Sequence, residues 1–404
     1  MASQGLQLLR RADFARFTFG RMGNTLGWQM LAVAMGWQVY ALTHDPLALG
    51  YVGLCEFLPF VTLVLAGGYA ADHGNRKLIL VAMAGIDAGC AGVLLWTSLA
   101  GVASPWPIYA VAAVFGASRA FWAPAMQAYL INIVRRDEVA PAVAFDSTLR
   151  QIATVSGPAL GGVLFVFGAP AVYAIIGAMF LSAALLTSGI RTQPPRAQPS
   201  GSGRAHELME GLRFVLGNRI LLGCISLDLF AVLFGGAVAL LPVFAADILH
   251  IGPAGLGVLR SAPAIGAAVV GATLAYYAPR HHAGTWMFGG VTVFGIATIV
   301  FGLSTSFWLS MAALIVAGAG DMCSVYVRLT LAQLNTPEPI RGRVSAVNSM
   351  FIGASNELGA FESGVTARWF GTVPSVVIGG CATLAVVAAW VLAFPQLRRV
   401  PPLR

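Results

Sequence analysis

The sequence predicts an all-α membrane protein of twelve transmembrane helices, arranged as two pseudo-symmetric six-helix bundles with both termini in the cytoplasm. Three observations support this fold. Of the 404 residues, 58% are apolar and only 10% are charged, which differs from the composition of soluble domains. The apolar residues gather into segments of about 20 residues or more, the length that crosses ~30 Å of hydrocarbon. A segment rich in Pro, Gly and Ser separates the first six of these segments from the last six.

The predicted helices are apolar runs separated by short polar, Gly-rich or Pro-rich loops. They cover residues 15–42, 49–71, 78–100, 107–130, 142–167, 170–190, 220–246, 254–277, 284–304, 307–331, 344–370 and 373–395. Lys and Arg residues outside or at the edges of these spans fall in the tails and in the loops after even-numbered spans. Because Lys and Arg resist translocation, this pattern predicts cytoplasmic termini. The net charge of +8 is therefore a topology signal, and nucleic acid is not expected as a partner.

The predicted domains are an N-terminal bundle at 1–190, a linker at 191–218 and a C-terminal bundle at 219–404. Within the linker, residues 205–216 are expected to form a short amphipathic helix. The two halves resemble each other weakly: at an offset of 204 residues, Gly53 and Pro59 align with Gly257 and Pro263. Parallel halves with a site at their interface are the architecture of one large class of alternating-access carriers.

Charged side chains inside the apolar spans are the main functional signal. Each costs about 3 kcal/mol or more at membrane depth, so such residues tend to line a cavity or pair with one another. Burial favours the neutral form of a carboxyl group and a nearby Arg favours the ionised form, which makes a proton switch. The residues expected to couple transport to protons are Glu357, Asp321, Glu56 and the modulating cation Arg119.

Other polar residues in the spans have different expected roles. A pocket for a bulky amphipathic solute is expected from Trp28, Gln29, Gln38, Asp228 and Asn356. Asp146 and Arg150 are four residues apart on one helix face, so we expect an intrahelical ion pair. For Asp87 and Glu362 the sequence favours neither a functional nor a structural role.

Three motifs resemble those of the major facilitator superfamily. The first, Gly68-Tyr69-Ala70-Ala71-Asp72-His73-Gly74-Asn75-Arg76-Lys77, resembles the superfamily's helix 2–3 loop motif G-x-L-A-D-R-x-G-R-K. It departs from the motif at His73 and Asn75. By this resemblance, Gly68, Asp72, Arg76 and Lys77 form a conformational latch between the halves of the transporter.

The second motif, Gly157-Pro158-Ala159-Leu160-Gly161-Gly162, resembles the G-P-x-x-G-G antiporter motif of proton-coupled exporters. The third, Arg119, is similar to a helix 4 arginine associated with proton coupling, without the Gln-Gly that usually follows it. Independently of the family, Gly157, Gly161 and Gly162 allow close helix packing, and Pro158 allows a bend. The enterobactin-exporter-like branch, among the drug:proton antiporters, is the subgroup that the sequence resembles most.

The resemblance implies a proton-driven exporter of a drug or a siderophore across the inner membrane, a function also associated with multidrug resistance. One alternative is an uptake carrier of the same fold for a nutrient or lysophospholipid, and another is a non-transporting membrane receptor. An enzyme is not expected, since the sequence has no nucleotide-binding loop, zinc-helix motif or recognisable nucleophile. No cofactor or metal is expected. The expected partners are the small-molecule substrate, protons and the lipid bilayer, and the expected state is a monomer.

Overall fold

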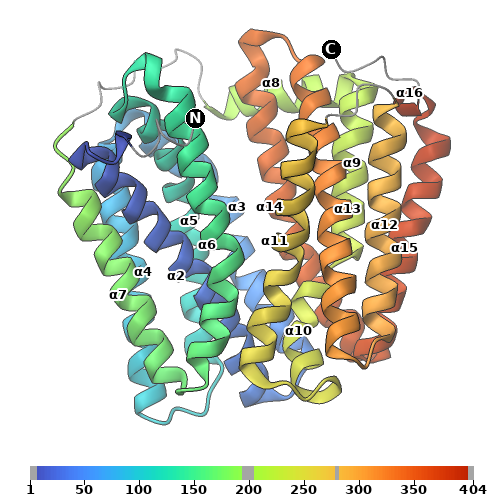
Figure 1. Ribbon diagram of the computed structural model, residues 1–404, viewed down its shortest axis with the longest axis horizontal. Coiled ribbons are helices and arrows are strands. Elements are labelled where there is room, and N and C mark those ends of the chain that lie inside the picture. Colours follow the sequence, from blue (N-terminus) through green and yellow to red (C-terminus); the bar gives the residue numbers. More distant parts are fainter. Residues whose placement is uncertain (1–6, 193–203, 278–281, 399–404) are drawn as a thin grey trace. The chain divides into compact units, whose positions relative to one another are not determined.

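The computed structural model describes residues 7–192, 204–277 and 282–398, and the elements in these ranges are all helices (Figure 1). The middle of the predicted linker, residues 193–203, lies outside the described residues. The chain divides into two compact units. Unit 1 consists of Met1–Thr43, Cys55–Gly201 and Pro253–Ser261, and unit 2 consists of His44–Leu54, Ser202–Gly252 and Ala262–Arg404.

Unit 1 is formed mainly by the first six long helices. These are α2 (Ala12–Thr43), α3 (Pro46–His73), α4 (Arg76–Leu99), α5 (Trp106–Ile133), α6 (Val139–Phe165) and α7 (Ala169–Ser188). Asn75 starts α4 because its side chain accepts a hydrogen bond from the N–H of Leu78. Gly168 joins α6 to α7 with a φ of 97°, a conformation that favours glycine. Helix α4 packs along α7, and α2 packs along α6 and α7.

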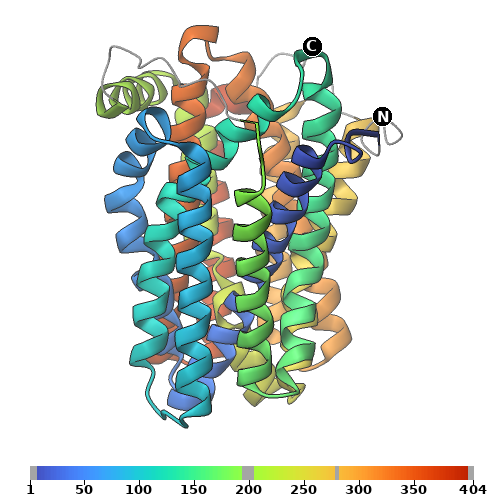
Figure 2. The same cartoon turned by 90° about the vertical axis from the view of Figure 1, so that its left-hand side faces the viewer.

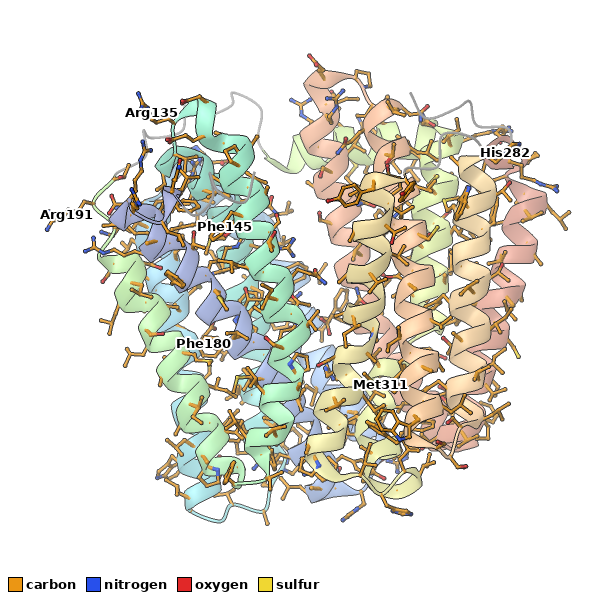
Figure 3. All side chains as sticks on the ribbon, viewed as in Figure 1. Arg135, Phe145, Phe180, Arg191, His282 and Met311 are labelled. Atoms are coloured by element: carbon orange, nitrogen blue, oxygen red, sulfur yellow. The ribbon has the colours of Figure 1, made fainter. Side chains whose placement is uncertain are left out.

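Aromatic side chains contribute to the core of unit 1. Phe14 and Phe17 of α2 pack in one buried cluster with Tyr129 of α5. Phe180 of α7, labelled in Figure 3, is fully buried, and its ring lies where a side chain at Gly27 of α2 would stand. A Cβ atom at position 27 would be 2.7 Å from that ring, so the packing of α2 on α7 requires glycine there.

Unit 2 contains most of the remaining helices, although residues 253–261 of α11 belong to unit 1. The remaining helices are α8 (Arg204–Gly217), α9 (Arg219–Phe234), η2 (Ala237–Leu240), α10 (Leu241–Val243), η3 (Phe244–Ile248), α11 (Gly252–Tyr276), α12 (Ala283–Leu303), α13 (Phe307–Leu334), α14 (Arg341–Phe370), α15 (Thr372–Ala393) and α16 (Pro395–Arg398). Helix α8 confirms the predicted short helix, and Figures 1 and 2 show it lying crosswise to α14. Arg343 of α14 holds it through an ion pair with Glu210.

One predicted span is not a continuous α-helix. Residues 220–246 were expected as a single helix, but α9 ends at Phe234 and the chain continues to Ile248 through 3-10, α and π turns. Gly235 and Gly236 follow the last residue of α9, and Pro242 lies in the next segment. Glycine lowers helix propensity and proline lacks the N–H that a continuing helix needs, which explains the interruption.

Nine helical segments in the described part of the chain are long and apolar enough to cross a membrane. They include α3, α4, α5, α7, α11, α12, α13, α15 and the segment Arg219–Ile248. Helices α2, α6 and α14 lie over the other three predicted spans without meeting that criterion. All three carry charged side chains, such as Arg21, Asp146 and Glu357. The all-helical fold is confirmed, whereas the count of twelve spans and the side on which the termini lie stay predictions.

The five cysteines are all free thiols within helices. Cys90, Cys224 and Cys323 are buried, Cys55 is half-buried, and Cys381 of α15 is exposed. Each therefore acts as a small apolar side chain.

Candidate functional site

Two of the predicted proton-coupling residues meet in unit 1. Arg119 of α5 forms an ion pair with Glu56 of α3, and its guanidinium lies 5.5 Å from the centre of the Phe60 ring. Their side chains are 30% and 15% exposed, respectively. Gly116, one turn before Arg119, makes this approach possible, because a Cβ atom there would overlap the backbone of Glu56. The pair combines a carboxylate with a cation in a partly desolvated site.

The predicted cavity residues of α2 make contacts inside unit 1. The half-buried Trp28 packs edge-on against Phe115 and Trp122, and its indole N–H donates to Asp87. Gln29 lies against the position that a side chain at Gly157 would take. Gln38 donates from Nε2 to Ser98 Oγ at 3.2 Å and accepts a hydrogen bond from the Tyr173 hydroxyl. The amide group of Gln38 therefore helps to hold α2 against α4 and α7.

A buried charge cluster lies in unit 2. Asp228 of α9 and Arg328 of α13 form an ion pair, with side chains only 6% and 2% exposed. Asp321 lies seven residues before Arg328 on α13, on the same helix face, and interacts electrostatically with both residues. The cluster thus holds two carboxyl groups and one guanidinium. If both carboxyl groups were ionised, one negative charge would have no compensating cation within the cluster.

Glu357 and Asn356 of α14 face different surroundings in unit 2. Asn356 is exposed and its amide donates to Ile352 O of its own helix. Glu357 is half-buried beside Gly53 at the N-terminal part of α3. A Cβ atom at Gly53 would lie 3.2 Å from Glu357 O and 3.7 Å from its Oε2. The backbone around Glu357 is therefore packed tightly against α3.

The glycines of the second motif form two packing faces on α6. A side chain at Gly157 or Gly161 would meet α2, since the added Cβ atoms would lie 2.5 Å from Gln29 Cβ and 2.8 Å from Met30 Cα. On another face, a Cβ atom at Gly162 would lie 2.7 Å from Gly257 Cα of α11. Pro158 is buried inside α6, and its carbonyl oxygen also faces Gly257. These contacts, all within unit 1, explain the small residues by close helix packing.

The first motif lies at the junction of α3 and α4. Gly68 and Asp72 belong to the last turns of α3, while Arg76 and Lys77 begin α4. Arg76 Nε donates to Ala71 O at 2.8 Å, which closes the turn between the two helices. Lys77 Nζ donates to Ile190 O at 2.7 Å, just after α7.

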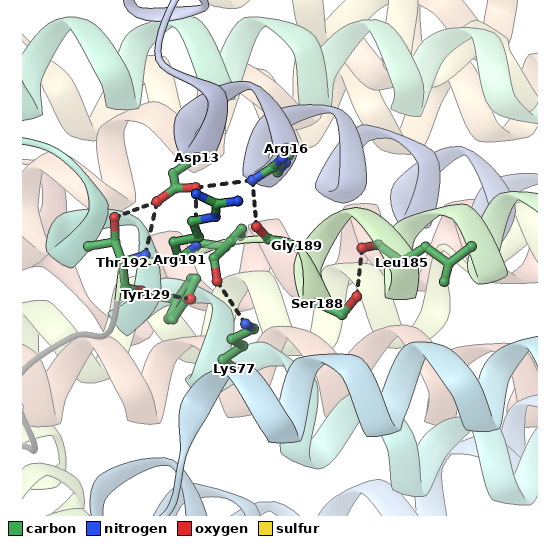
Figure 4. A network of polar contacts seen from close by, with 10 residues as sticks. Asp13, Arg16, Lys77, Tyr129, Leu185, Ser188, Gly189, Arg191 and Thr192 are labelled. Atoms are coloured by element: carbon green, nitrogen blue, oxygen red, sulfur yellow. Dashed lines mark hydrogen bonds and ion pairs between the residues drawn. The ribbon is translucent and has the colours of Figure 1, made fainter.

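Lys77 belongs to a polar network around the start of α2 (Figure 4). The carboxylate of Asp13 accepts hydrogen bonds from the backbone N–H groups of Arg191 and Thr192 and from the Thr192 hydroxyl. Arg16 donates to Gly189 O. Burial alone would raise the pKa of Asp13, but these hydrogen bonds and nearby Arg16 together hold it below its ordinary value of 3.8. The network fastens the chain after α7 to α2 and α4.

The expected pair of Asp146 with Arg150 is wrong. Asp146 of α6 lies 2.6 Å from Arg21 of α2, and both side chains are largely buried, at 5% and 15% exposed. Arg150, one turn further along α6, is exposed and attracts Asp146 less strongly than Arg21 does. An inward-facing carboxylate gains more from a partner in the same desolvated region than from a solvated arginine on its own helix. The contact joins α2 to α6.

Three residues outside the predicted site proved to be central to these clusters: Arg328, Arg21 and Asp87. The spacing of Asp321 and Arg328 was a usable signal, since seven residues return to the same face of a helix. No comparable signal links Arg21 to Asp146, which lie 125 residues apart. Among the described residues, no group of three or more His, Cys, Asp or Glu side chains is placed to hold a metal ion.

Comparison with known proteins gives consistent matches over nearly the whole chain. The profile of the family described as transmembrane secretion effector matches residues 4–401. The enterobactin exporter EntS of Citrobacter koseri is 26% identical over 400 residues, covering 98% of this chain and 95% of the relative. EntS of Shigella flexneri is 25% identical over 397 residues, with the same coverage.

Solved structures match the fold at lower identity. A mutant of the nucleoside transporter NupG has a TM-score of 0.79 at 14% identity, covering 94% of this chain and 99% of that chain. A bacterial homologue of the human lysosomal transporter Spinster, in an inward-facing and occupied conformation, has a TM-score of 0.78 at 15% identity and covers 98% and 99% of the two chains. At these identities the likeness concerns the fold alone.

Proposed function

Since the chain belongs to the transmembrane secretion effector family of the major facilitator superfamily, we propose that it is a proton-coupled exporter of an amphipathic small molecule. It is a transporter and a multi-pass protein of the inner membrane. The proposed substrate is a drug or a siderophore, in line with the relatives named enterobactin exporters. Alternating access between an N-terminal bundle at 1–190 and a C-terminal bundle at 219–404, joined by the linker at 191–218, is the proposed route.

The buried cluster of Asp228, Arg328 and Asp321 is the observation that carries the proposal of proton coupling. Its two carboxyl groups share one guanidinium, and the ion pair is almost completely removed from solvent. Binding of one proton makes the cluster electrically neutral, whereas its loss leaves a net negative charge. A site with this property responds to a proton gradient, and Asp321 is its proposed proton carrier.

The other predicted residues keep proposed roles. Glu357 is a second proposed proton carrier, and the Glu56–Arg119 pair is a proposed modulating site. Trp28, Gln29, Gln38, Asp228 and Asn356 are the proposed substrate contacts. Gly68, Asp72, Arg76 and Lys77 are proposed as the conformational latch. A monomer with cytoplasmic termini is the proposed state.

The test is pH-gradient-driven movement of fluorescent drugs and siderophores in inverted vesicles. The wild type is compared with Asp321→Asn, Glu357→Gln and the matched control Asp137→Asn, whose carboxylate is exposed after α5. Accumulation that follows the gradient, persists in the control and is lost in either of the first two variants supports the proposal. Normal accumulation in both variants contradicts the site, and transport in the opposite direction supports an uptake carrier instead.

A further inference from the structure

Asp87 of α4 has an unusual environment for a carboxyl group. Asp87 is 0% exposed and lies in the interior of unit 1. The indole N–H of Trp28 donates to Oδ2 at 3.2 Å, while Oδ1 has no hydrogen-bond partner among the described residues. An ionised carboxylate in such a place normally accepts several hydrogen bonds or pairs with a cation.

The charges near Asp87 do not compensate for an ionised carboxylate. Arg119, the cation of the adjoining helix α5, pairs with Glu56, and Glu56 itself interacts repulsively with Asp87. Arg21 on α2 is held by Asp146. A further titratable group that interacts with Asp87 is the uncharged thiol of Cys90 on the same helix. Removal of the proton from Asp87 therefore adds a second negative charge beside Glu56.

Two further polar groups in the region lack partners. Ser118 of α5 lies beside Asp87, and its hydroxyl oxygen, like Oδ1, is buried with no hydrogen-bond partner in the described residues. Asn24 lies one turn before Trp28 on the same face of α2 and is 1% exposed. Its Oδ1 and Nδ2 atoms are also buried with no hydrogen-bond partner in the described residues. The Ser118 hydroxyl can accept a hydrogen bond from a protonated Oδ1 or donate one to an ionised Oδ1, so it does not replace the missing cation.

We propose that Asp87 is a proton-binding site in unit 1 and that Trp28 senses whether the proton is bound. When the proton leaves, the new negative charge attracts the indole N–H that already donates to Oδ2 and the Ser118 hydroxyl beside it, so the position of the Trp28 ring changes with the charge. That ring packs against Phe115 and Trp122, with ring centres 5.4 and 4.6 Å away. The link from this movement to transported substrate rests on the proposed function, whereas proton binding does not.

Infrared difference spectroscopy of the full chain in lipid vesicles tests the site directly. A protonated carboxyl group gives a C=O band that shifts in D2O. We expect part of this band to disappear in Asp87→Asn and to remain in the control Asp137→Asn. If Asp87→Asn does not fold, Asp87→Glu is expected to move the band without removing it. A band that is identical in the wild type and the folded Asp87 variants overturns the proposal.

Trp28→Phe tests the sensing role, because phenylalanine keeps a ring but has no N–H donor. A hydrogen bond stabilises the charged acceptor more than the neutral one, so the band is expected to persist to a pH about one unit higher. An unchanged titration overturns the role of Trp28. Both measurements are made without a substrate. If the band is assigned to Asp87 but the protein moves no probe, only the proposed function is contradicted. If the protein transports a probe but has no such band, only this inference is contradicted.

Discussion

Arg21 of α2 lies 2.6 Å from Asp146 of α6, and this pair joins two helices inside unit 1. Removing one partner of a buried pair leaves the other charge without compensation, which typically costs about 3 kcal/mol or more. We therefore expect Asp146→Asn to lower the melting temperature in detergent by several degrees, and Arg21→Met with Asp146→Leu to recover part of that loss. Arg150→Gln is the matched control. If Arg150→Gln lowers the melting temperature more than Arg21→Met does, Arg150 is the main partner of Asp146 and the pair is intrahelical.

The ion pair of Asp45 and Arg368 in unit 2 is expected to contribute little to stability, unlike the buried pair of Arg21 and Asp146. Its side chains are 32% and 54% exposed, and exposed pairs contribute at most about 1 kcal/mol. Arg368→Gln is expected to change the melting temperature very little. Because salt screens exposed charges, even this small change should disappear at high salt. A loss as large as that of Asp146→Asn would show that solvent does not screen this contact.

Gly161 and Gly85 are expected to respond with opposite signs to the same substitution. Gly161→Ala places a Cβ atom 2.8 Å from Met30 Cα, so α6 must move away from α2 and stability falls, by about 1 to 3 kcal/mol. Gly85 of α4 has no atom within 4 Å of the added Cβ atom. Gly85→Ala is therefore expected to stabilise the helix by about 0.5 to 1 kcal/mol. Thermal melting checks both, and equal effects would contradict the packing described for α6.

Asp13 gives a pH dependence with a defined sign. Because its folded pKa lies below the ordinary 3.8, the network contributes its full stability above that value and loses it as the pH falls through the lowered pKa. Asp13→Asn removes this titration and keeps an acceptor oxygen. The difference in melting temperature between wild type and Asp13→Asn is expected above pH 3.8 and should shrink below it. Thr192→Val, which lacks the hydroxyl donor, should show a smaller pH dependence than the wild type.

Lys77 is expected to protect the chain just after α7 from hydrogen exchange. Its ammonium group donates to Ile190 O, next to the Arg191 and Thr192 amides that Asp13 binds. A hydrogen bond contributes about 1 kcal/mol, so Lys77→Met should speed exchange of these amides about fivefold. Lys77→Arg keeps a donor and should preserve most of the protection. Equal exchange rates in the wild type and Lys77→Met would show that Lys77 does not stabilise the network.

The sequence predicted the helices well because length and apolar content depend on local residues. The position of α8 between residues 204 and 217, and the pairing of small residues along α6, follow from patterns within single segments. The interruption after Phe234 was missed, since apolar content continues through Gly235 and Gly236 although the α-helix does not.

The partners of buried charges were harder to predict than the charges themselves. The partner of Asp146 is set by how α2 packs on α6, a long-range contact that leaves no periodic signal. For Glu56 and Arg119, both residues were predicted, but only the structure brings them together across α3 and α5. The sequence favoured neither role for Asp87, because its unusual feature is the missing hydrogen-bond partner of Oδ1. That feature depends on how α2, α4 and α5 pack together.

The distribution of the five cysteines makes the wild-type chain suitable for site-specific labelling. A water-soluble maleimide reacts with solvated thiolates, yet Cys90, Cys224 and Cys323 are buried. The half-buried Cys55 and the exposed Cys381 both lie on apolar helices that are long enough to cross the membrane. A single cysteine introduced at an exposed loop position, such as Asp137, should therefore take up a spin label or dye selectively. Distance changes during turnover then become measurable without first replacing the native thiols.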